Sequence, residues 1–222
     1  KVGIIKKGDK GKYYDRFRSR IMFPIFDSSG RPVGFSGRIF NGKEDEAKYL
    51  NSPETIFFDK SRILYGFDRA KSVIRKSDFS ILVEGQMDLI MCHQAGYKNA
   101  VASSGTALTR EQLEKLFRIS ERLVIAYDSD GAGFRASEKA WQMALSLGMD
   151  VKIAPIPDGY DPADVIKEDK NKWKEIVKNS RHIIEIVIEH IARDAKDERD
   201  TGRKVSSHLI PYLASISSHI DQ

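Results

Sequence analysis

The stretch "SILVEGQMDLIM", residues 80–91, decides the fold that this sequence predicts. Its first four residues are small or apolar and indicate a buried strand. The run stops at an acid, Glu84, and the glycine that follows allows a sharp turn and the close approach of a ligand. A second acid, Asp88, falls in or near the first turn of the helix that is predicted next. Two carboxylates at the end of a buried strand indicate a binding site.

Apolar strands alternate with helices along the middle of the chain. Thr109 and Gln112 form a capping box at the start of one of these helices, and Gly148 is a suitable end for another. This rhythm predicts a parallel α/β sheet flanked by helices. The predicted strands are 79–84, 100–103, 123–128 and 151–156, and the predicted helices are 87–95, 110–120 and 133–147.

The two ends of the chain have other patterns. Near the N-terminus, the apolar runs 21–26 and 33–40 flank the turn-type cluster Asp27–Gly30 and predict a β-hairpin. The C-terminal part is mostly helical, with Trp173 on an apolar face and a kink or break predicted at Pro211. We therefore expect a basic, mixed α/β N-terminal subdomain, a central α/β domain and a C-terminal helical bundle, over residues 1–77, 78–160 and 161–222.

Charge is distributed unevenly along the chain. Residues 1–77 contain 18 of the 37 Lys and Arg residues but only 9 of the 32 Asp and Glu residues, a balance of +9. The remainder of the chain has a balance of −4. A basic surface attracts phosphate groups, as in nucleic acids and nucleotides, whereas a cluster of acids attracts metal cations. The two parts are therefore expected to have different tasks.

The sequence also argues against several classes of protein. Cys92 is the single cysteine, so neither an intrachain disulfide nor a cysteine-based zinc site is encoded. The apolar runs are far shorter than the roughly 20 residues of a membrane-spanning helix, and the phosphate-binding loop of P-loop ATPases is absent from the sequence. The chain begins with charged residues, and with Lys1 rather than Met. We expect a cytoplasmic fragment of a longer protein, without a membrane partner.

Further acids follow another predicted strand. "LVIAYDSDGAG", residues 123–133, carries Asp128 and Asp130, and residues two apart in an extended chain point to the same side. Because ligands bind outside the carboxyl ends of parallel strands, these acids are expected to converge with Glu84. Like charges about 4 Å apart repel by roughly 4 kcal/mol at an effective dielectric constant of about 20, so such a cluster raises its pKa values or holds cations. Mg²⁺ prefers oxygen ligands and often bridges to phosphates, which predicts metal-assisted phosphate chemistry.

Two other acids have a structural alternative. Asp88, as a first-turn acid, would also complement the helix dipole. In "PIPDGYDPADVI", residues 155–166, Asp161 would be the N-cap of a helix with a proline at its first position. Helix capping and metal binding both stay open for Asp161, and one residue can serve both.

Two short motifs on these strand ends resemble a known domain. "EGQMD" at 84–88, followed by "DSDGAG" at 128–133, resembles the Toprim domain, which is shared by bacterial primases, topoisomerases and some nucleases. Three longer segments resemble the bacterial replicative primase family, DnaG: "RFRSRIMFPIFDSSGRPVGFSGRIF", "AKYLNSPETIFFDKSRILYGFDRAK" and "AVASSGTALTREQ", at 16–40, 47–71 and 100–112. The resemblance implies an RNA polymerase region, built around a Toprim-type parallel-rich sheet, without the family's zinc-binding and helicase-binding modules.

The resemblance also implies roles for individual residues. The metal ligands would be Glu84, Asp128 and Asp130, which are also the catalytic residues, with Asp88 and Asp161 close by; the metal would be Mg²⁺, with Mn²⁺ as an alternative. The residues that contact nucleotide phosphates or the primer–template would be Arg38, Lys48, Asn51 and Lys60.

The sequence departs from the family pattern at three places. Gln86 stands where many relatives have Tyr, and Ser129 where they have Gly. The second acid of the family's Asp-Pro-Asp motif is displaced by one residue, to Asp164. Asp161 is therefore the better candidate for a metal site.

The expected function is the synthesis of short RNA primers from ribonucleoside triphosphates on a single-stranded DNA template, by two-metal nucleotidyl transfer. A replicative helicase would be a partner through a module that is missing from this chain, and the fragment alone is expected to be weakly active. Two alternatives stay open: strand cleavage, as in a Toprim nuclease or topoisomerase, and a non-catalytic module that binds single-stranded DNA.

Overall fold

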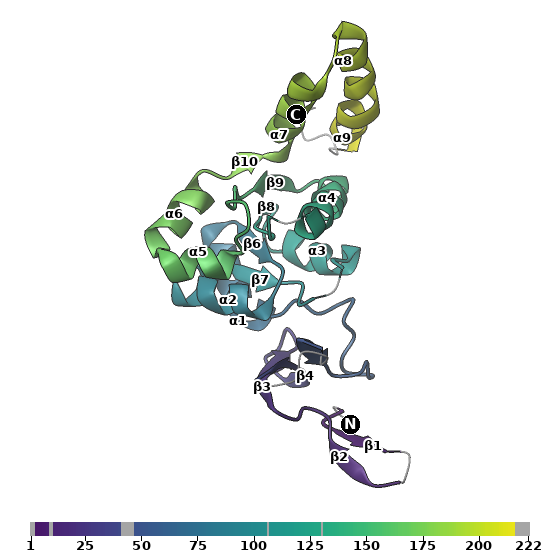
Figure 1. Cartoon of the computed structure of the whole chain (residues 1–222), viewed down its shortest axis with the longest axis vertical. Helices are drawn as coiled ribbons and strands as arrows, with labels where there is room; N and C mark the ends of the chain where they lie inside the picture. The colour runs from purple at the N-terminus through teal and green to yellow at the C-terminus, as the bar shows by residue number, and fades with distance from the viewer. Residues whose placement is uncertain (1–2, 9–10, 41–46, 106, 130, 216–222) are drawn as a thin grey trace.

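The computed structural model describes the chain except for residues 1–2, 9–10, 41–46, 106, 130 and 216–222. The molecule is elongated (Figure 1). The N-terminal strands lie at one end, a sheet covered by helices lies in the middle, and the last helices lie at the other end. Within the described residues, no helix is both long and apolar enough to cross a membrane.

The N-terminal part is built from two small antiparallel sheets and one helix. The predicted hairpin is confirmed. Its two strands are paired, with Arg20 opposite Ile39 at one end and Phe26 opposite Pro32 at the other, next to the turn that begins at Asp27. The Asp27 carboxylate accepts hydrogen bonds from the N–H groups of Ser29 and Arg31, which closes the turn. The elements are β1 (Ile5–Lys7) paired with β2 (Tyr13–Asp15), the sheet β3 (Arg20–Phe26), β4 (Pro32–Ile39) and β5 (Tyr49–Asn51), and helix α1 (Phe67–Ser77).

The central sheet has the strand order β10-β9-β8-β6-β7, in which β7, β6, β8 and β9 are parallel. The predicted parallel-rich α/β sheet is therefore confirmed. The ladders are shorter than predicted at their carboxyl ends, because the chain leaves the sheet before Glu84 and before Asp128. The elements are β6 (Ser80–Val83), α2 (Gln86–Gln94), β7 (Ala100–Ala102), α3 (Arg110–Phe117), β8 (Arg122–Ile125), α4 (Gly131–Ser146), β9 (Asp150–Ile153) and the antiparallel edge strand β10 (Arg181–His182).

Helices cover both faces of this sheet. Alternate strand residues point to opposite sides of the sheet. Leu82 packs with α1, α3 and α4 on one face, whereas Ile81 and Val83 pack with α2, α5 (Pro162–Glu168) and α6 (Lys170–Lys178) on the other. Trp173 of α6 is fully buried, as predicted for a core residue. Its ring and that of Tyr97 pack in a T-shaped arrangement, with 6.0 Å between the ring centroids. Helices α5 and α6 therefore share the hydrophobic core of the sheet.

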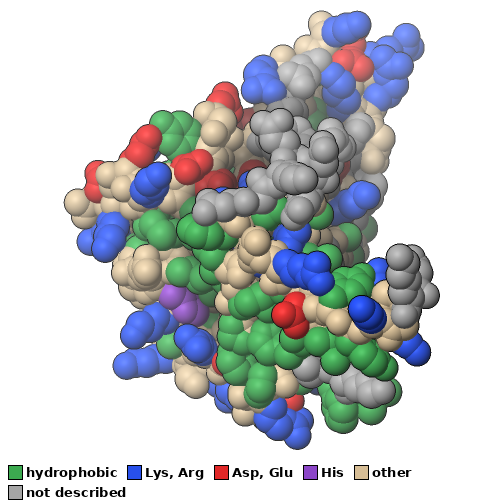
Figure 2. All heavy atoms as spheres, turned by 60° about the horizontal axis from the view of Figure 1, so that its bottom comes forward, with side chains coloured by type: hydrophobic (Ala, Val, Ile, Leu, Met, Phe, Trp, Pro, Cys, Tyr) green, Lys and Arg blue, Asp and Glu red, His purple; other side chains and the backbone are tan. Residues whose placement is uncertain are grey.

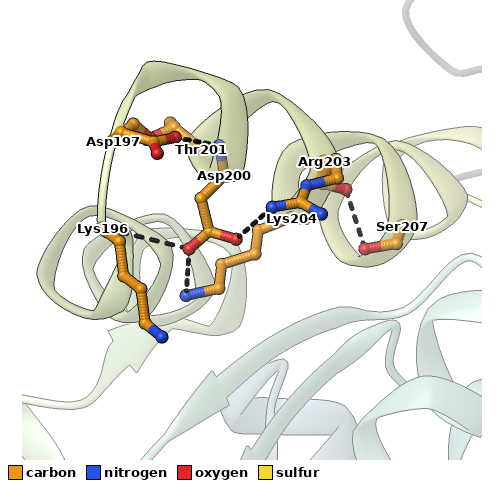
Figure 3. A network of polar contacts seen from close by, with 7 residues as sticks. All are labelled: Lys196, Asp197, Asp200, Thr201, Arg203, Lys204 and Ser207. Atoms are coloured by element: carbon orange, nitrogen blue, oxygen red, sulfur yellow. Dashed lines mark hydrogen bonds and ion pairs between the residues drawn. The ribbon is translucent and has the colours of Figure 1, made fainter.

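The remaining helices project from the sheet (Figure 1): α7 (Ile183–Asp194), α8 (Glu198–Lys204) and α9 (Ile210–Ser215). A π-helical turn over Val205–Leu209 joins the last two and ends just before Pro211, the predicted kink site. Asp200 ties the start of α8 together, since its carboxylate accepts from the Lys196 N–H at 3.1 Å and lies 3.1 Å from the Lys204 ammonium (Figure 3). Contacts of this kind near the surface are screened by solvent and contribute little to the stability of the fold.

Candidate metal and nucleotide site

Two acids meet where neighbouring parallel strands end. Glu84 follows β6 and Asp128 lies three residues after β8, and these strands are paired with Leu82 opposite Ile125. The backbone N–H of Asp128 donates a hydrogen bond to Glu84 Oε1 at 3.3 Å. Local structure thus directs the Glu84 side chain across the strand ends toward the Asp128 backbone.

Asp88 lies in the first turn of α2 and is only 6% exposed. One carboxylate oxygen accepts from the Gly85 N–H at 3.0 Å, and the other accepts from the Ala163 N–H at 3.3 Å. The side chain therefore bridges the starts of α2 and α5. An added Cβ at position 85 would lie 2.9 Å from the Asp88 carboxylate, so a larger residue there would displace this side chain.

The acids influence one another electrostatically. Burial raises the pKa of Asp88 to about 7, and the negative charges of Asp161 and Asp128 act in the same direction. Asp161 is the N-cap of α5, where its carboxylate accepts from the Asp164 N–H at 2.7 Å. A partly desolvated group of acids of this kind is stabilised by a cation.

The donor set suits a hard divalent cation, because its side-chain ligands would all be carboxylate oxygens. Among the described residues, no three Asp, Glu, His or Cys side chains are arranged closely enough to hold one ion. Asp130, a predicted ligand, lies outside the described residues. The described acids that face this region are Glu84, Asp88, Asp128 and Asp161.

The structure also places the departures from the family pattern. Gln86 is buried in the first turn of α2 and donates a hydrogen bond to the Ser104 hydroxyl, in the loop after β7. The N–H of Ser129 donates to the Tyr160 carbonyl at 3.4 Å. Asp164 is an exposed residue whose backbone N–H, bonded to Asp161, closes the N-cap.

The N-terminal sheet brings a cation toward the acids. Arg38 on β4 lies opposite Tyr49 on β5, with its guanidinium carbon 5.7 Å from the centre of the Tyr49 ring. Burial raises the pKa of Tyr49, Arg38 lowers it, and the charges of Asp88 and Asp161 raise it. Tyr49, on the edge strand β5 of this sheet, is therefore close enough to Arg38 and to the acids for both to act on its pKa.

Sequence reasoning did not single out Tyr49. A signal was present, because Tyr49 directly follows Lys48 and lies two residues before Asn51, in the same motif.

Asn51 and Lys60 line one small cavity, of about 20 Å³, between the N-terminal sheet and the loop after β7. Ser103 and Ser104 of that loop form another part of its wall. Within the part of the chain that the structure describes, the buried side-chain oxygen of Asn51 has no hydrogen-bond partner. The cavity therefore brings Asn51 and Lys60 near the loop that follows β7, and most of the rest of its wall is apolar.

Lys48 is exposed just before β5, and its carbonyl accepts from the Ile39 N–H at 3.0 Å. Seen from the N-terminal end of the molecule, Lys and Arg side chains surround an apolar area (Figure 2).

Comparison with known proteins identifies the family. Residues 1–71 match the model described as the N-terminal domain of the DNA primase catalytic core, and residues 81–166 match a Toprim-like model. The crystal structure of a DNA primase domain from Pseudomonas aeruginosa is 33% identical, with a TM-score of 0.88 over 99% of this chain and 70% of that chain. The chain belongs to the DnaG primase family. The structure of a DnaG primase catalytic domain bound to ssDNA is 31% identical, with a TM-score of 0.87 over 99% of this chain and 72% of that one.

Curated members of the family are longer than this chain. The DNA primase of Listeria monocytogenes is 44% identical over 182 residues, which are 81% of this chain and 29% of the relative. The DNA primase of Clostridium acetobutylicum is 40% identical over 223 residues, which cover this chain completely and 36% of the relative. The chain therefore spans about a third of the length of these DnaG primases.

Proposed function

We propose that the chain is the catalytic part of a DNA primase, which synthesises short RNA primers from ribonucleoside triphosphates on single-stranded DNA during replication. The observation that carries the proposal is that Glu84 and Asp128 meet at the ends of neighbouring parallel strands, with Asp88 held close to them by backbone hydrogen bonds. Arg38 and the acids Asp88 and Asp161 all act on the pKa of Tyr49, so a cation of the N-terminal sheet lies in the neighbourhood of the acids. Acids that bind metal ions, with cations that bind phosphate nearby, suit the transfer of a nucleotide.

In this proposal, Glu84, Asp128 and Asp130 hold Mg²⁺ or Mn²⁺, with Asp88 and Asp161 beside them. Bound divalent ions lower the pKa of an attacking hydroxyl and stabilise the charge of the leaving pyrophosphate. The chain's own contribution is to hold these acids in place: the Asp128 N–H orients Glu84, and the starts of α2 and α5 hold Asp88.

The basic and polar residues Arg38, Lys48, Asn51 and Lys60 would bind the triphosphate and the template backbone. Contacts of this kind position a nucleic acid without reading its sequence. Asn51 and Lys60 line the same small cavity and so lie near each other, and Arg38 on β4 adds a cation beside Tyr49.

The division into an N-terminal subdomain (1–77), a Toprim domain (78–160) and a C-terminal helical subdomain (161–222) remains our proposal for how the work is shared. We also propose that a replicative helicase binds the longer protein through a module outside this sequence, and that the protein acts in the cytoplasm. The fragment alone is expected to be weakly active, because neighbouring modules would help to hold the template.

Glu84→Gln tests the proposal. The change keeps the size of the side chain and removes its charge, so primer synthesis should fall by about 100-fold or more, while the fold and the affinity for single-stranded DNA stay nearly unchanged. The measurement is the incorporation of labelled nucleotides on a single-stranded template with Mg²⁺. The exposed Glu175 on α6 provides a matched control, since Glu175→Gln should leave synthesis intact. Normal synthesis by Glu84→Gln would contradict the proposal.

Two further assays separate the alternatives. Nicking or relaxation of a supercoiled plasmid without nucleotides would favour a Toprim nuclease or topoisomerase. A large increase in thermal stability with Mg²⁺, but no binding of nucleoside triphosphates, would favour a DNA-binding module that uses the metal only for structure.

A further inference from the structure

Helix α3 holds the segment that carries Lys60 by an unusual set of contacts. Four consecutive backbone carbonyls of this segment accept hydrogen bonds from side chains of α3 and of its N-cap residue, Thr109. Gln112 Nε2 donates to two of them, Thr109 Oγ1 to one and Lys115 Nζ to one, and the four acceptors are the carbonyls of Lys60, Ser61, Arg62 and Ile63. One helix therefore fixes the path of a turn that is about 50 residues away in the sequence.

Gln112 is the central member of this set. It is fully buried, and its amide donates to the Lys60 carbonyl at 3.0 Å and to the Ile63 carbonyl at 2.8 Å. Its side-chain oxygen accepts from the Thr109 N–H at 3.0 Å, and Thr109 Oγ1 accepts from the Gln112 N–H at 3.2 Å. The capping box that starts α3 is thus also the clamp on the Lys60 segment, so the start of α3 and this segment are joined by the same side chain.

The clamped segment is itself stiff. The Asp59 carboxylate accepts from both the N–H and the hydroxyl of Ser61, and the Arg62 N–H donates to the Asp59 carbonyl at 3.1 Å. Beyond the turn, Tyr65 exchanges two backbone hydrogen bonds with Ala102 at the end of β7. Because the backbone is held on both sides, the position of Lys60 relative to the sheet depends on α3 and β7.

We propose that Gln112, supported by Thr109 and Lys115, is a positioning residue that sets the place of Lys60 for nucleotide binding. The inference rests on the proposed role of Lys60 as a phosphate contact. Gln112 itself touches no ligand in this proposal; it acts through the backbone of Lys60, whose side chain lines the cavity shared with Asn51 and Ser104. A small displacement of a substrate-positioning group has a large effect on binding and rate.

The test is a double-mutant cycle on nucleotide affinity. Gln112→Met keeps the length of the side chain but removes both donors, and should weaken the binding of a fluorescent ATP analogue with Mg²⁺ by about tenfold. In the Lys60→Ala background the same change should have almost no further effect, because the group that it positions is gone. A purely structural role would reduce stability without this loss of additivity.

Asn99→Leu is a matched control, because Asn99 is also a buried amide that donates to a backbone carbonyl, that of Phe79 at 3.1 Å. It should lower the unfolding temperature and leave the affinity for the analogue unchanged. If Gln112→Met does not fold, Lys115→Met takes its place, with an expected loss of roughly threefold that also disappears in the Lys60→Ala background.

The outcomes distinguish this inference from the function on which it rests. Normal binding by the folded Gln112 variant, or an effect that adds in full to that of Lys60→Ala, overturns the positioning role alone. Normal binding by Lys60→Ala overturns the proposed phosphate contact, and the positioning role with it.

Discussion

The Asp88 carboxyl is held in a place where its charge is costly. Burial and two neighbouring acids raise its pKa from an ordinary 3.8 to about 7. Between these two pH values, Asp88 of the metal-free protein is therefore protonated in the folded state and ionised in the unfolded chain. The contribution of Asp88 to the free energy of unfolding should accordingly be most favourable below about pH 4, and should become less favourable as the pH rises to about 7.

Asp88→Asn tests this cost directly. The amide, like a protonated carboxyl, carries no charge and accepts one of the two backbone hydrogen bonds, so the variant should be about 4 kcal/mol more stable than the parent at pH 8 in EDTA. Urea unfolding at pH 4 and pH 8 measures the difference, which should nearly vanish at pH 4. Equal stability of the two proteins at pH 8 would contradict the raised pKa.

At the scale of single residues, the sequence was informative about the acids and less so about their neighbours. Glu84 and Asp128 could be placed together because parallel strands end at the same edge of a sheet. The position of Tyr49 could not be predicted, because it depends on how near the edge strand β5 comes to Asp88 and Asp161, which belong to a different part of the chain. The second task of Gln112 could not be predicted either. The sequence predicted its capping box, but not the hydrogen bonds that its side chain donates to the carbonyls of Lys60 and Ile63.

At the scale of elements, the N-terminus of α5 has two candidate tasks for one residue. Asp161 caps the helix through the Asp164 N–H, and its charge acts on Asp88. Ser is as good an N-cap as Asp but carries no charge, so it separates the two tasks.

Asp161→Ser should therefore leave the free energy of unfolding within about 0.5 kcal/mol of the parent, whereas Asp161→Ala should lose about 1 kcal/mol. Both variants should bind Mg²⁺ more weakly, by several-fold in calorimetric titration. Unchanged Mg²⁺ affinity in the Ser variant would show that Asp161 is only a helix cap.

The elements themselves were predicted well where a pattern is local, and less well where packing decides. The hairpin from Arg20 to Ile39 and the alternation of strands and helices follow from periodicity and turn residues. The ends of the strands were placed too late, because burial alone does not make a residue part of a strand: Tyr127 is buried but lies beyond the end of β8. The π-helical turn before Pro211 has no sequence pattern of its own.

At the scale of the whole molecule, the chain joins a basic N-terminal part to a sheet whose strand ends carry acids. The predicted boundary at residue 160 falls just before α5, although α5 and α6 share the core of the sheet through Val165 and Trp173. Helical periodicity predicts a helix, but it does not say which core the helix joins. The basic part is in turn joined to the same sheet, through the backbone hydrogen bonds between Tyr65 and Ala102.

This arrangement makes a prediction about salt. If the basic part binds the phosphates of single-stranded DNA, the logarithm of the affinity should fall linearly with the logarithm of the salt concentration, by about 0.7 for each phosphate contact. Lys48 is exposed at the edge of the N-terminal sheet, so Lys48→Ala should reduce this slope by about 0.7 and weaken binding at low salt.

Lys174 is the matched control, because it is an exposed lysine on α6, in the acidic part of the chain. Lys174→Ala removes the same charge from the molecule, yet should leave the slope unchanged. Fluorescence anisotropy of a labelled oligonucleotide between about 50 and 200 mM salt measures both. Equal changes in the two variants would mean that DNA responds to the net charge of the molecule rather than to a site. A change in Lys48→Ala alone would place the nucleic acid on the N-terminal sheet, beside the residues that face the acids.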